Sequence, residues 1–306
     1  MVTTRYPQAI LLSCEIPWND KEELLEDVFR KEVRAVLAGG FNHLYIFGTA
    51  GEGYAVTLSQ FQEIVRIFRE ETRIDGIFPM VGVIGMSTAQ VVEKVGFAFD
   101  QGFRAFQIAL PPWGELDDDE YLVYFQDVCG NFPNASFIHY NLPRGRRLLT
   151  GPDYRRLADA VPNLAGTKNT RTDINDIASI ATHAPELQHF YGECGFPIGC
   201  LFGECSLLSS YGALFPAKTR EFFRYGVEKQ WDKLFPLMKE YLQVMADFDE
   251  PTLERSGIDG CYDKMIVRGS GIDLPLRLLS PYLCFDMEVY DSVMKLIRER
   301  YPDWLK

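Results

Sequence analysis

Short apolar runs alternate with longer amphipathic segments along the first two-thirds of the chain. The short runs are rich in aliphatic and aromatic residues and carry few charges, as is typical of buried parallel strands. Strands are predicted at Ala9–Cys14, His43–Phe47, Phe78–Val83, Ala105–Ala109, Ser136–Tyr140, Leu164–Lys168, Gln188–Tyr191 and Cys205–Ser209.

The segments between these runs repeat apolar residues at helical spacing. Thr57 with Gln60 and Ser87 with Gln90 are typical of helix starts, and Gly102 is typical of a helix end. Helices are predicted over residues 22–38, 57–72, 87–101, 118–130, 151–160, 172–184 and 196–202.

Eight strands that alternate with helices predict an α/β fold, a (β/α)8 TIM barrel, rather than an open doubly wound sheet. The first strand is not followed by G-x-G-x-x-G, which weighs against dinucleotide binding. We expect the barrel over residues 1–225 and a C-terminal helical extension over 226–306, packed on it as a single structural unit. The extension is predicted to contain helices near 229–248, 262–268 and 287–300, after a barrel helix at 215–225 and with a turn at 249–251.

Composition narrows the classes of partner. The chain has 306 residues and a formal net charge of −12, so neither nucleic acid nor an anionic membrane is expected to bind it. Seven cysteines without a C-x-x-C pair indicate reduced thiols and a cytoplasmic protein. Cys194, Cys200 and Cys205 match no common zinc spacing, so no metal is expected. Residues 1–7 lack the apolar core of a signal peptide.

The strand Leu164–Lys168 ends on a lone ammonium group. A lysine there that turns into a pocket loses hydration, so its pKa falls and free amine is present near neutral pH. Free amine in a pocket is the nucleophile that forms a Schiff base with a carbonyl substrate. A surface lysine at a strand end is the alternative that this segment alone leaves open.

The second strand runs into the glycine-rich segment Gly48–Gly53. Its backbone is able to turn tightly and point successive N–H groups inward, as a nest for a carboxylate or phosphate. The hydroxyl of Thr49 both donates and accepts, which suits a proton relay. An ordinary glycine-rich turn fits the local sequence equally well.

The fifth strand places Tyr140 and His139 on opposite faces. If Tyr140 points into the barrel mouth, its phenol is able to act as acid and base. His139 then faces the surrounding helices and is expected to be structural. On its own, Tyr140 is equally consistent with a packing aromatic.

Further candidates follow the fourth and fifth strands, where a barrel carries its chemistry. Trp113, after Pro111–Pro112, forms either an apolar wall of a substrate pocket or a cover over the barrel end. Arg144, Arg146 and Arg147 allow two interpretations. Either one of them binds a substrate carboxylate, or all three belong to a solvated basic loop.

Taken together, these segments resemble the Schiff-base pyruvate aldolases of the dihydrodipicolinate synthase and N-acetylneuraminate lyase family. The resemblance runs from about residue 9 to near 300, and its specificity comes from the order and spacing of four motifs. They are Gly48–Glu52, Pro111–Pro112, Tyr140–Pro143 and Gly166–Lys168; Tyr191–Glu193 and Leu208–Ser209, with Pro216 downstream, match later segments more loosely.

The resemblance implies roles for particular residues. Lys168 would be the Schiff-base nucleophile towards pyruvate or another 2-keto acid, and Tyr140 the proton shuttle. The Thr49 and Ala50 N–H groups would hold the keto-acid carboxylate, with the Thr49 hydroxyl in the relay. No metal or cofactor is implied, because the protonated imine itself withdraws electrons. Further substrate-binding candidates are Gly48, Trp113, Arg144, Arg146, Gly192 and Ser209.

Three departures from the family pattern concern the substrate. Ala50 replaces the second hydroxyl of the Gly48–Glu52 loop. Trp113-Gly114 stands where dihydrodipicolinate synthases have two tyrosines, the second of which completes a relay across a subunit interface. The arginine that follows their Tyr-Asn-x-Pro motif falls on Gly145, between Arg144 and Arg146. These departures argue against dihydrodipicolinate synthesis.

The expected activity is that of a lyase or aldolase that makes or cleaves a C–C bond next to a pyruvate unit. A 2-keto acid dehydratase or hydratase-aldolase using the same imine, and a non-catalytic keto-acid-binding paralogue, are the alternatives. The expected ligands are a 2-keto acid and an aldehyde or sugar-acid co-substrate. The family resemblance also implies a homo-oligomer, either a dimer or a tetramer.

Overall fold

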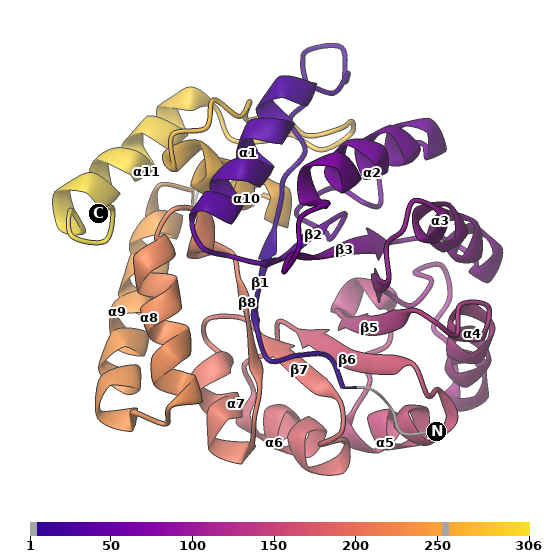
Figure 1. Cartoon of the computed structure of the whole chain (residues 1–306). Coiled ribbons are helices and arrows are strands. Elements are labelled where there is room, and N and C mark those ends of the chain that lie inside the picture. The colour runs from indigo at the N-terminus through magenta and orange to yellow at the C-terminus, as the bar shows by residue number, and fades with distance from the viewer. Residues whose placement is uncertain (1–4, 253–256) are drawn as a thin grey trace.

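The computed structural model describes residues 5–252 and 257–306. Residues 1–4, part of the N-terminal segment predicted to lack a signal-peptide core, lie outside the described part. Within the described ranges, eight parallel strands close into a barrel in sequence order, with β8 next to β1 (Figure 1). The predicted TIM barrel is therefore confirmed. The strands are β1 (Ile10–Ser13), β2 (His43–Ile46), β3 (Phe78–Val83), β4 (Ala105–Ile108), β5 (Ser136–Asn141), β6 (Leu164–Asn169), β7 (Gln188–Tyr191) and β8 (Ser206–Ser209).

Helices surround the barrel and follow the predicted ranges closely. The capping interactions of Thr57 and Ser87 are present, and Gly102 has a positive φ of 95° after the third helix. The barrel helices are α1 (Glu26–Ala38), α2 (Leu58–Thr72), α3 (Thr88–Asp100), α4 (Asp118–Gly130), α5 (Gly151–Ala160), α6 (Ile174–His183), α7 (Phe196–Phe202) and α8 (Pro216–Val227).

The first helix begins later than predicted, at Glu26 rather than residue 22. Asn19 folds the preceding segment into a turn, because its side-chain oxygen accepts hydrogen bonds from the backbone N–H groups of Lys21 and Glu23. Trp18 and Leu24 then form an isolated antiparallel bridge. Local side-chain hydrogen bonding thus replaces the helical turn that the apolar spacing indicated.

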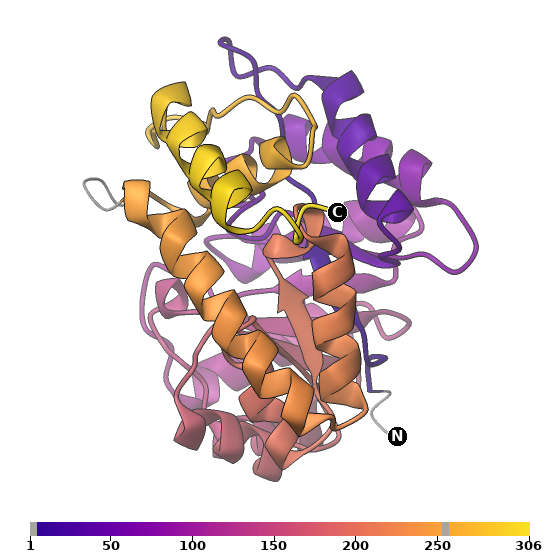
Figure 2. The same cartoon turned by 90° about the vertical axis from the view of Figure 1, so that its left-hand side faces the viewer.

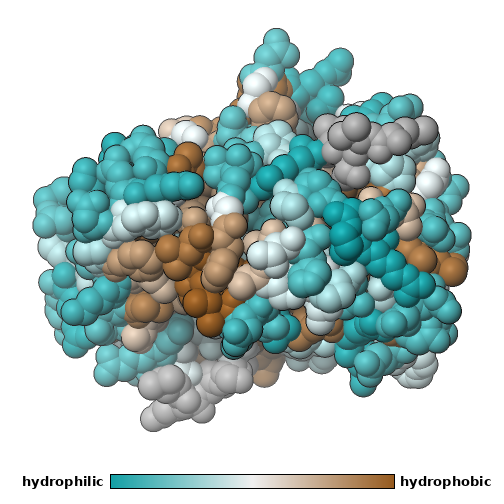
Figure 3. Space-filling model, turned by 90° about the horizontal axis from the view of Figure 1, so that it is seen from below, coloured by the Kyte–Doolittle hydropathy of each residue, from teal (hydrophilic) through white to brown (hydrophobic). Residues whose placement is uncertain are grey.

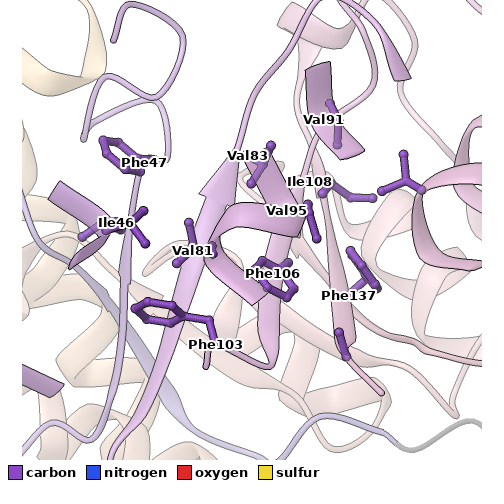
Figure 4. Close-up of a cluster of buried hydrophobic side chains, with 14 of the residues drawn as sticks. Ile46, Phe47, Val81, Val83, Val91, Val95, Phe103, Phe106, Ile108 and Phe137 are labelled. Carbon is purple, nitrogen blue, oxygen red and sulfur yellow. The ribbon is translucent and has the colours of Figure 1, made fainter. Parts of the chain in front are cut away.

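Alternate strand residues supply two separate apolar layers. One fills the barrel and includes Leu11, Tyr45, Met80 and Ile138. The other lies between the strands and the helices. Figure 4 shows part of this outer layer, where α3 side chains pack beside the outward residues of β3 and β4. The period of two therefore decides which strand residues face the barrel interior and its mouth. The labelled side chains are Ile46, Phe47, Val81, Val83, Val91, Val95, Phe103, Phe106, Ile108 and Phe137.

In the described part of the chain, three further helices follow α8. Figure 2 shows α9 alongside α8, with α11 crossing near their upper ends. The ring of Trp304, just beyond α11, packs 4.8 Å from that of Tyr241 in α9 and 5.3 Å from that of Phe215. The division at residues 225 and 226 stays a prediction, and α8 continues two residues beyond it. The helices are α9 (Trp231–Asp249), α10 (Asp259–Gly269) and α11 (Met287–Arg300), with a short 3-10 turn (Glu250–Thr252) after α9.

The face that carries α5, α6 and α7 is mostly hydrophilic, with apolar side chains gathered in one area (Figure 3). Ile174 of α6 and Leu201 and Phe202 of α7 are among the large apolar side chains exposed to solvent. Within the described residues, no helix combines the length and apolar character needed to cross a membrane.

Candidate functional site

Lys168 lies near the end of β6, inside the barrel mouth, and its residue is only 2% exposed. Its Nζ donates a hydrogen bond of 3.0 Å to the Tyr45 hydroxyl. The same nitrogen lies 3.8 Å from the centroid of the Tyr140 ring and 4.3 Å from that of the Tyr45 ring. Pairing of β5 with β6 sets Tyr140 directly opposite Lys168. The amine therefore sits between two tyrosine side chains.

Burial lowers the pKa of Lys168 to about 7, against the opposing charges of Asp259, Asp263 and Glu15. A substantial fraction of the side chain is therefore unprotonated near neutral pH. An unprotonated lysine in a desolvated position is a nucleophile for a carbonyl carbon. This position agrees with the nucleophilic alternative and not with a surface lysine.

Tyr140 is buried beside the amine. Burial and then the charge of Asp259 raise the pKa of Tyr140 to about 12, while the Thr49 hydroxyl and the Arg144 guanidinium act in the opposite direction. The phenol is therefore protonated at neutral pH and is able to donate a proton to a developing oxyanion. On the other face of β5, His139 contacts the Tyr154 hydroxyl at 2.8 Å, which confirms that it is structural.

The glycine-rich loop after β2 approaches Lys168 closely. A Cβ at Gly48 would lie 2.8 Å from the Tyr45 ring and 3.3 Å from Lys168 Nζ, so a side chain there would collide with the site. In the hydrogen bonds of the described residues, the N–H groups of Thr49 and Ala50 donate to no protein acceptor. These two donors are available to a carboxylate, as the nest interpretation requires.

Thr49 also presents a buried hydroxyl. Its Oγ1 has no hydrogen-bond partner of ordinary geometry among the described residues, yet it is near enough to the Tyr140 phenol to lower the pKa of that phenol. A buried hydroxyl without a partner costs free energy. A substrate oxygen between Thr49 and Tyr140 would satisfy it.

Glu52 fixes the loop from behind, which the sequence did not indicate. Its buried carboxylate accepts hydrogen bonds from Trp18 Nε1 at 2.9 Å, Lys264 Nζ at 2.7 Å and the Leu279 N–H at 2.6 Å. Neither Glu52 nor Lys264 has an exposed side chain, so this is a buried ion pair between the loop and α10. In addition, a Cβ at Gly260 of α10 would lie 2.8 Å from the Ala50 carbonyl oxygen. Helix α10 therefore packs directly against the loop.

We expect Glu52→Gln to lower the free energy of unfolding by about 3–5 kcal/mol, because Lys264 would remain as a buried charge without its partner. Urea denaturation followed by circular dichroism measures the change. Asp273→Asn is a matched control, since it removes a carboxylate from the Arg268 ion pair whose Asp273 side chain is 89% exposed. A loss of stability no larger than that of the control would contradict a structural role for the Glu52–Lys264 pair.

A small cavity opens from Thr49 towards the rim. It has a volume of about 180 Å³. Its lining is mainly apolar, with Thr49, Tyr54 and Arg144 as polar contributors. The other lining residues are Ile84, Ala109, Leu110, Pro112, Leu142, Gly145, Ile258 and Tyr282.

Of the rim candidates Trp113, Arg144 and Arg146, the structure brings only Arg144 into this cavity. Trp113 is 82% exposed and does not line it. Arg144 forms a two-point ion pair with Asp259 at 3.0 and 3.1 Å, and Arg146 donates to the Pro112 carbonyl oxygen at 3.0 Å. Of these three residues, only Arg144 lines the cavity, and its charge is already paired.

Gly192 and Ser209 lie at the ends of β7 and β8. The Ser209 hydroxyl donates to Glu193 Oε1 at 2.9 Å, and the Ser210 and Tyr211 N–H groups donate to the same oxygen. Ser209 therefore positions Glu193 in this structure. A Cβ at Gly192 would meet nothing within 4 Å, which leaves open space at that position.

The cysteines cluster only loosely. Cys200 and Cys205 have sulfur atoms 3.5 Å apart, whereas the Cys194 sulfur contacts that of Met245. Within residues 5–252 and 257–306, no group of three or more His, Cys, Asp or Glu side chains is placed to hold a metal ion.

The site contains several residues that the sequence analysis did not select. Tyr45 contacts the Lys168 amine, and Glu15, Asp259 and Asp263 act on its pKa. Tyr45 had a signal, because the alternation of β2 places it inside the barrel. Glu15 had a signal too, because it is a charged residue directly after an apolar strand. Both acidic residues of α10 come from a distant part of the chain, where local spacing carries no such information.

Comparisons with known proteins identify the family of this chain. A model of the dihydrodipicolinate synthetase family matches residues 7–300. A 4-hydroxy-tetrahydrodipicolinate synthase of Salinibacter ruber is 26% identical over 174 residues, which are 56% of this chain and 56% of the relative. An N-acetylneuraminate lyase of Salmonella paratyphi B is 21% identical over 186 residues, 60% of this chain and 62% of the relative. The chain thus spans less than two thirds of either relative's length in these matches.

Solved structures show the same fold. YagE, a prophage protein of the dihydrodipicolinic acid synthase family from E. coli K12 solved with pyruvate, has a TM-score of 0.86 at 15% identity, covering 95% of this chain and 98% of that chain. CdNal from Clostridium difficile, solved with mannosamine, has a TM-score of 0.85 at 16% identity, and the match covers 97% of this chain and 100% of that chain.

Proposed function

Because the chain belongs to the dihydrodipicolinate synthetase family, we propose that it is a class I lyase or aldolase that makes or cleaves a C–C bond next to a pyruvate unit. Lys168 forms a Schiff base with pyruvate or another 2-keto acid. The observation that carries the proposal is the buried Lys168 amine, which lies beside Tyr140 and close to the Gly48 backbone. Its environment favours the free base that imine formation needs.

The other residues of the site have complementary roles in this proposal. The free N–H groups of Thr49 and Ala50 hold the keto-acid carboxylate. This carboxylate places the adjacent carbonyl carbon near Lys168. Tyr140 transfers protons at the reacting oxygen, with the Thr49 hydroxyl beside it. The protonated imine then accepts the electron pair of the C–C bond that breaks, as an enamine. No step requires a metal ion.

Dihydrodipicolinate synthesis is not the proposed reaction. At Gly114 a Cβ would meet nothing within 4 Å, so no side chain stands where the synthases have their second tyrosine. Arg144 is paired with Asp259, and Arg146 is turned to the Pro112 carbonyl. A glycine at 114, an Arg144 already paired and an Arg146 turned away support a reaction other than that of the synthases.

The rim cavity favours a co-substrate with an apolar distal part. A polyhydroxylated chain would lose hydrogen bonds to water against Ile84, Leu110, Leu142 and Ile258. An aromatic or branched aliphatic aldehyde would instead bury apolar surface against them. We therefore place such an aldehyde ahead of a sugar acid among the expected co-substrates.

The reaction is tested by product analysis. The protein is incubated with pyruvate and benzaldehyde, or with pyruvate and glyceraldehyde, and the products are separated by mass. A new C–C bond formed faster with benzaldehyde supports both the lyase and the apolar rim. In the cleavage direction, 2-keto-3-deoxy sugar acids that lose water without releasing pyruvate would contradict the aldolase and support a dehydratase. The homo-oligomer and the cytoplasmic location stay predictions.

A further inference from the structure

We propose that Tyr45 is a second proton-transfer residue at the Lys168 nitrogen, and that Ser13 and Glu15 extend it into a buried relay. The inference rests on the proposed function, because the relay serves imine formation. It assigns to the nitrogen side of the reaction a role separate from that of Tyr140, which serves the oxygen side.

Neighbouring strands bring the relay residues together. Pairing of β1 with β2 sets Ser13 directly opposite Tyr45. Leu11, two residues before Ser13, lies in the barrel interior with Tyr45, so the alternation of β1 turns Ser13 to the same side. Glu15 follows two residues later, just beyond the end of β1. All three relay residues are buried, and the Tyr45 hydroxyl accepts the hydrogen bond of Lys168 Nζ.

The Ser13 hydroxyl acts on both the phenol and the carboxyl group. Burial raises the pKa of Tyr45 well above its usual range, and the Ser13 hydroxyl acts against this rise. Burial also raises the pKa of Glu15 to about 7, and the same hydroxyl again opposes the change. Ser13 Oγ and Glu15 Oε2 are both buried and lack a hydrogen-bond partner of ordinary geometry in the described part of the chain. Such unpaired buried atoms cost about 1–3 kcal/mol each.

Other ionisable groups surround the relay. Tyr140 faces it from β5, the Glu52–Lys264 pair lies near Glu15, and Glu32 of α1 accepts the Glu15 N–H at 2.5 Å. The α10 carboxyl groups are Asp259, which is bound to Arg144, and Asp263.

Asp263 and Glu32 are the alternative acceptors for the proton. Asp263 interacts with the Ser210 side chain. Glu32 is engaged with the backbone of Glu15. Glu15 is thus the carboxyl group that shares a hydroxyl neighbour with Tyr45.

The relay moves one proton without a change in total charge. A proton of the Lys168 ammonium passes to the Tyr45 oxygen, the Tyr45 proton passes to Ser13 Oγ, and the Ser13 proton passes to the Glu15 carboxylate. Lys168 becomes the neutral amine, Glu15 becomes a carboxylic acid, and Tyr45 and Ser13 are regenerated. Because burial lowers the pKa of Lys168 and raises that of Glu15, the two pKa values approach each other and the free-energy cost of the transfer falls.

The stored proton then returns as the imine forms. The amine lone pair bonds to the keto carbon, and the carbonyl electrons move to oxygen, which is protonated and leaves as water. Ammonium and ketone therefore give protonated imine and water, with both water protons derived from the Lys168 nitrogen. Glu15 ends as the carboxylate, so the cycle needs no external acid or base.

The experiment measures the rate of imine formation alone. The protein is mixed with pyruvate, quenched with borohydride at successive times and analysed by mass spectrometry from about pH 5 to about pH 9. The wild-type rate is expected to rise with pH towards the pKa of Lys168, about 7, and to fall at higher pH, where Glu15 no longer holds the stored proton. Tyr45→Phe is expected to slow imine formation about 10²-fold or more at every pH.

Glu15→Gln separates a relay from a structural effect. Removal of its negative charge lowers the pKa of Lys168 further, so the rising limb should move to lower pH while the maximal rate falls about 10-fold or more. Tyr6→Phe is the matched control, because its buried phenol contacts His43 within the same barrel. Its imine rate should equal that of the wild type.

Two results would overturn the relay: a Tyr45→Phe rate equal to that of the wild type, or a Glu15→Gln pH profile that does not move. If Tyr45→Phe fails to fold, Ser13→Ala, which deletes one oxygen, must show the slow imine step instead; a wild-type rate in that variant also overturns the relay. A wild-type protein that forms no pyruvate adduct at all contradicts the proposed function itself.

Discussion

Replacing Lys168 with Met is expected to lower turnover by at least about 10⁴-fold, because no other group at the site is placed to form the imine. Methionine has a similar length and no charge, so it fits the space between the Tyr45 and Tyr140 rings. The measurement is the rate of the C–C bond reaction with excess pyruvate.

The same variant should not be less stable than the wild type. Burial lowers the pKa of Lys168, which means that the folded protein disfavours the charged side chain at this position. A thermal melt checks that the loss of turnover is not a loss of folding. Turnover of the folded Lys168→Met variant within about 10-fold of the wild type would contradict the role of Lys168 as nucleophile.

Tyr140→Phe is expected to slow turnover by about 10²–10⁴-fold while imine formation persists. The substitution keeps the aromatic ring that lies 3.8 Å from Lys168 Nζ but removes the hydroxyl. Because burial and Asp259 keep this phenol protonated, its loss removes the proton donor at the reacting oxygen. Turnover and the borohydride-trapped adduct are measured on the same preparation.

The two tyrosines next to Lys168 are therefore distinguishable. Tyr140→Phe should affect the step after the imine, whereas Tyr45→Phe should affect the imine itself. Tyr6→Phe again supplies a buried tyrosine change away from Lys168. Unchanged turnover in Tyr140→Phe would remove this residue from the mechanism.

The strand order was predictable because parallel barrel strands are buried on both faces. Their apolar runs stand out against amphipathic helices, and the predicted strand ends agree with the observed ones to within about one residue. Residues at the ends of different strands then meet at one rim by geometry alone. This is why Lys168 and Tyr140, far from adjacent in sequence, could be placed in one site.

Tertiary contacts determined what the sequence left open. The charge of Arg144 is paired with Asp259 of α10, and no local pattern indicated that partner. The exposed position of Trp113 depends on how the rim loop folds, which spacing does not specify. The start of α1 was displaced by the Asn19 turn, a local signal that outweighed helical periodicity.

Helix α10 shows most clearly why the helices beyond the barrel matter to its chemistry. Lys264 holds Glu52 behind the anion-binding loop, and Asp259 and Asp263 oppose the fall in the pKa of Lys168. Without these carboxylates, burial would lower the pKa of Lys168 further. The extension thus adjusts the nucleophile as well as packing on the barrel.

The central claim is that Lys168 forms an imine with a 2-keto acid. Borohydride reduction of the wild-type protein with pyruvate, followed by peptide mass spectrometry, tests it most directly. The predicted result is one reduced pyruvate adduct on the peptide that contains Lys168, absent when either pyruvate or borohydride is omitted. A folded protein without an adduct, or with its adduct on another lysine, would contradict the claim.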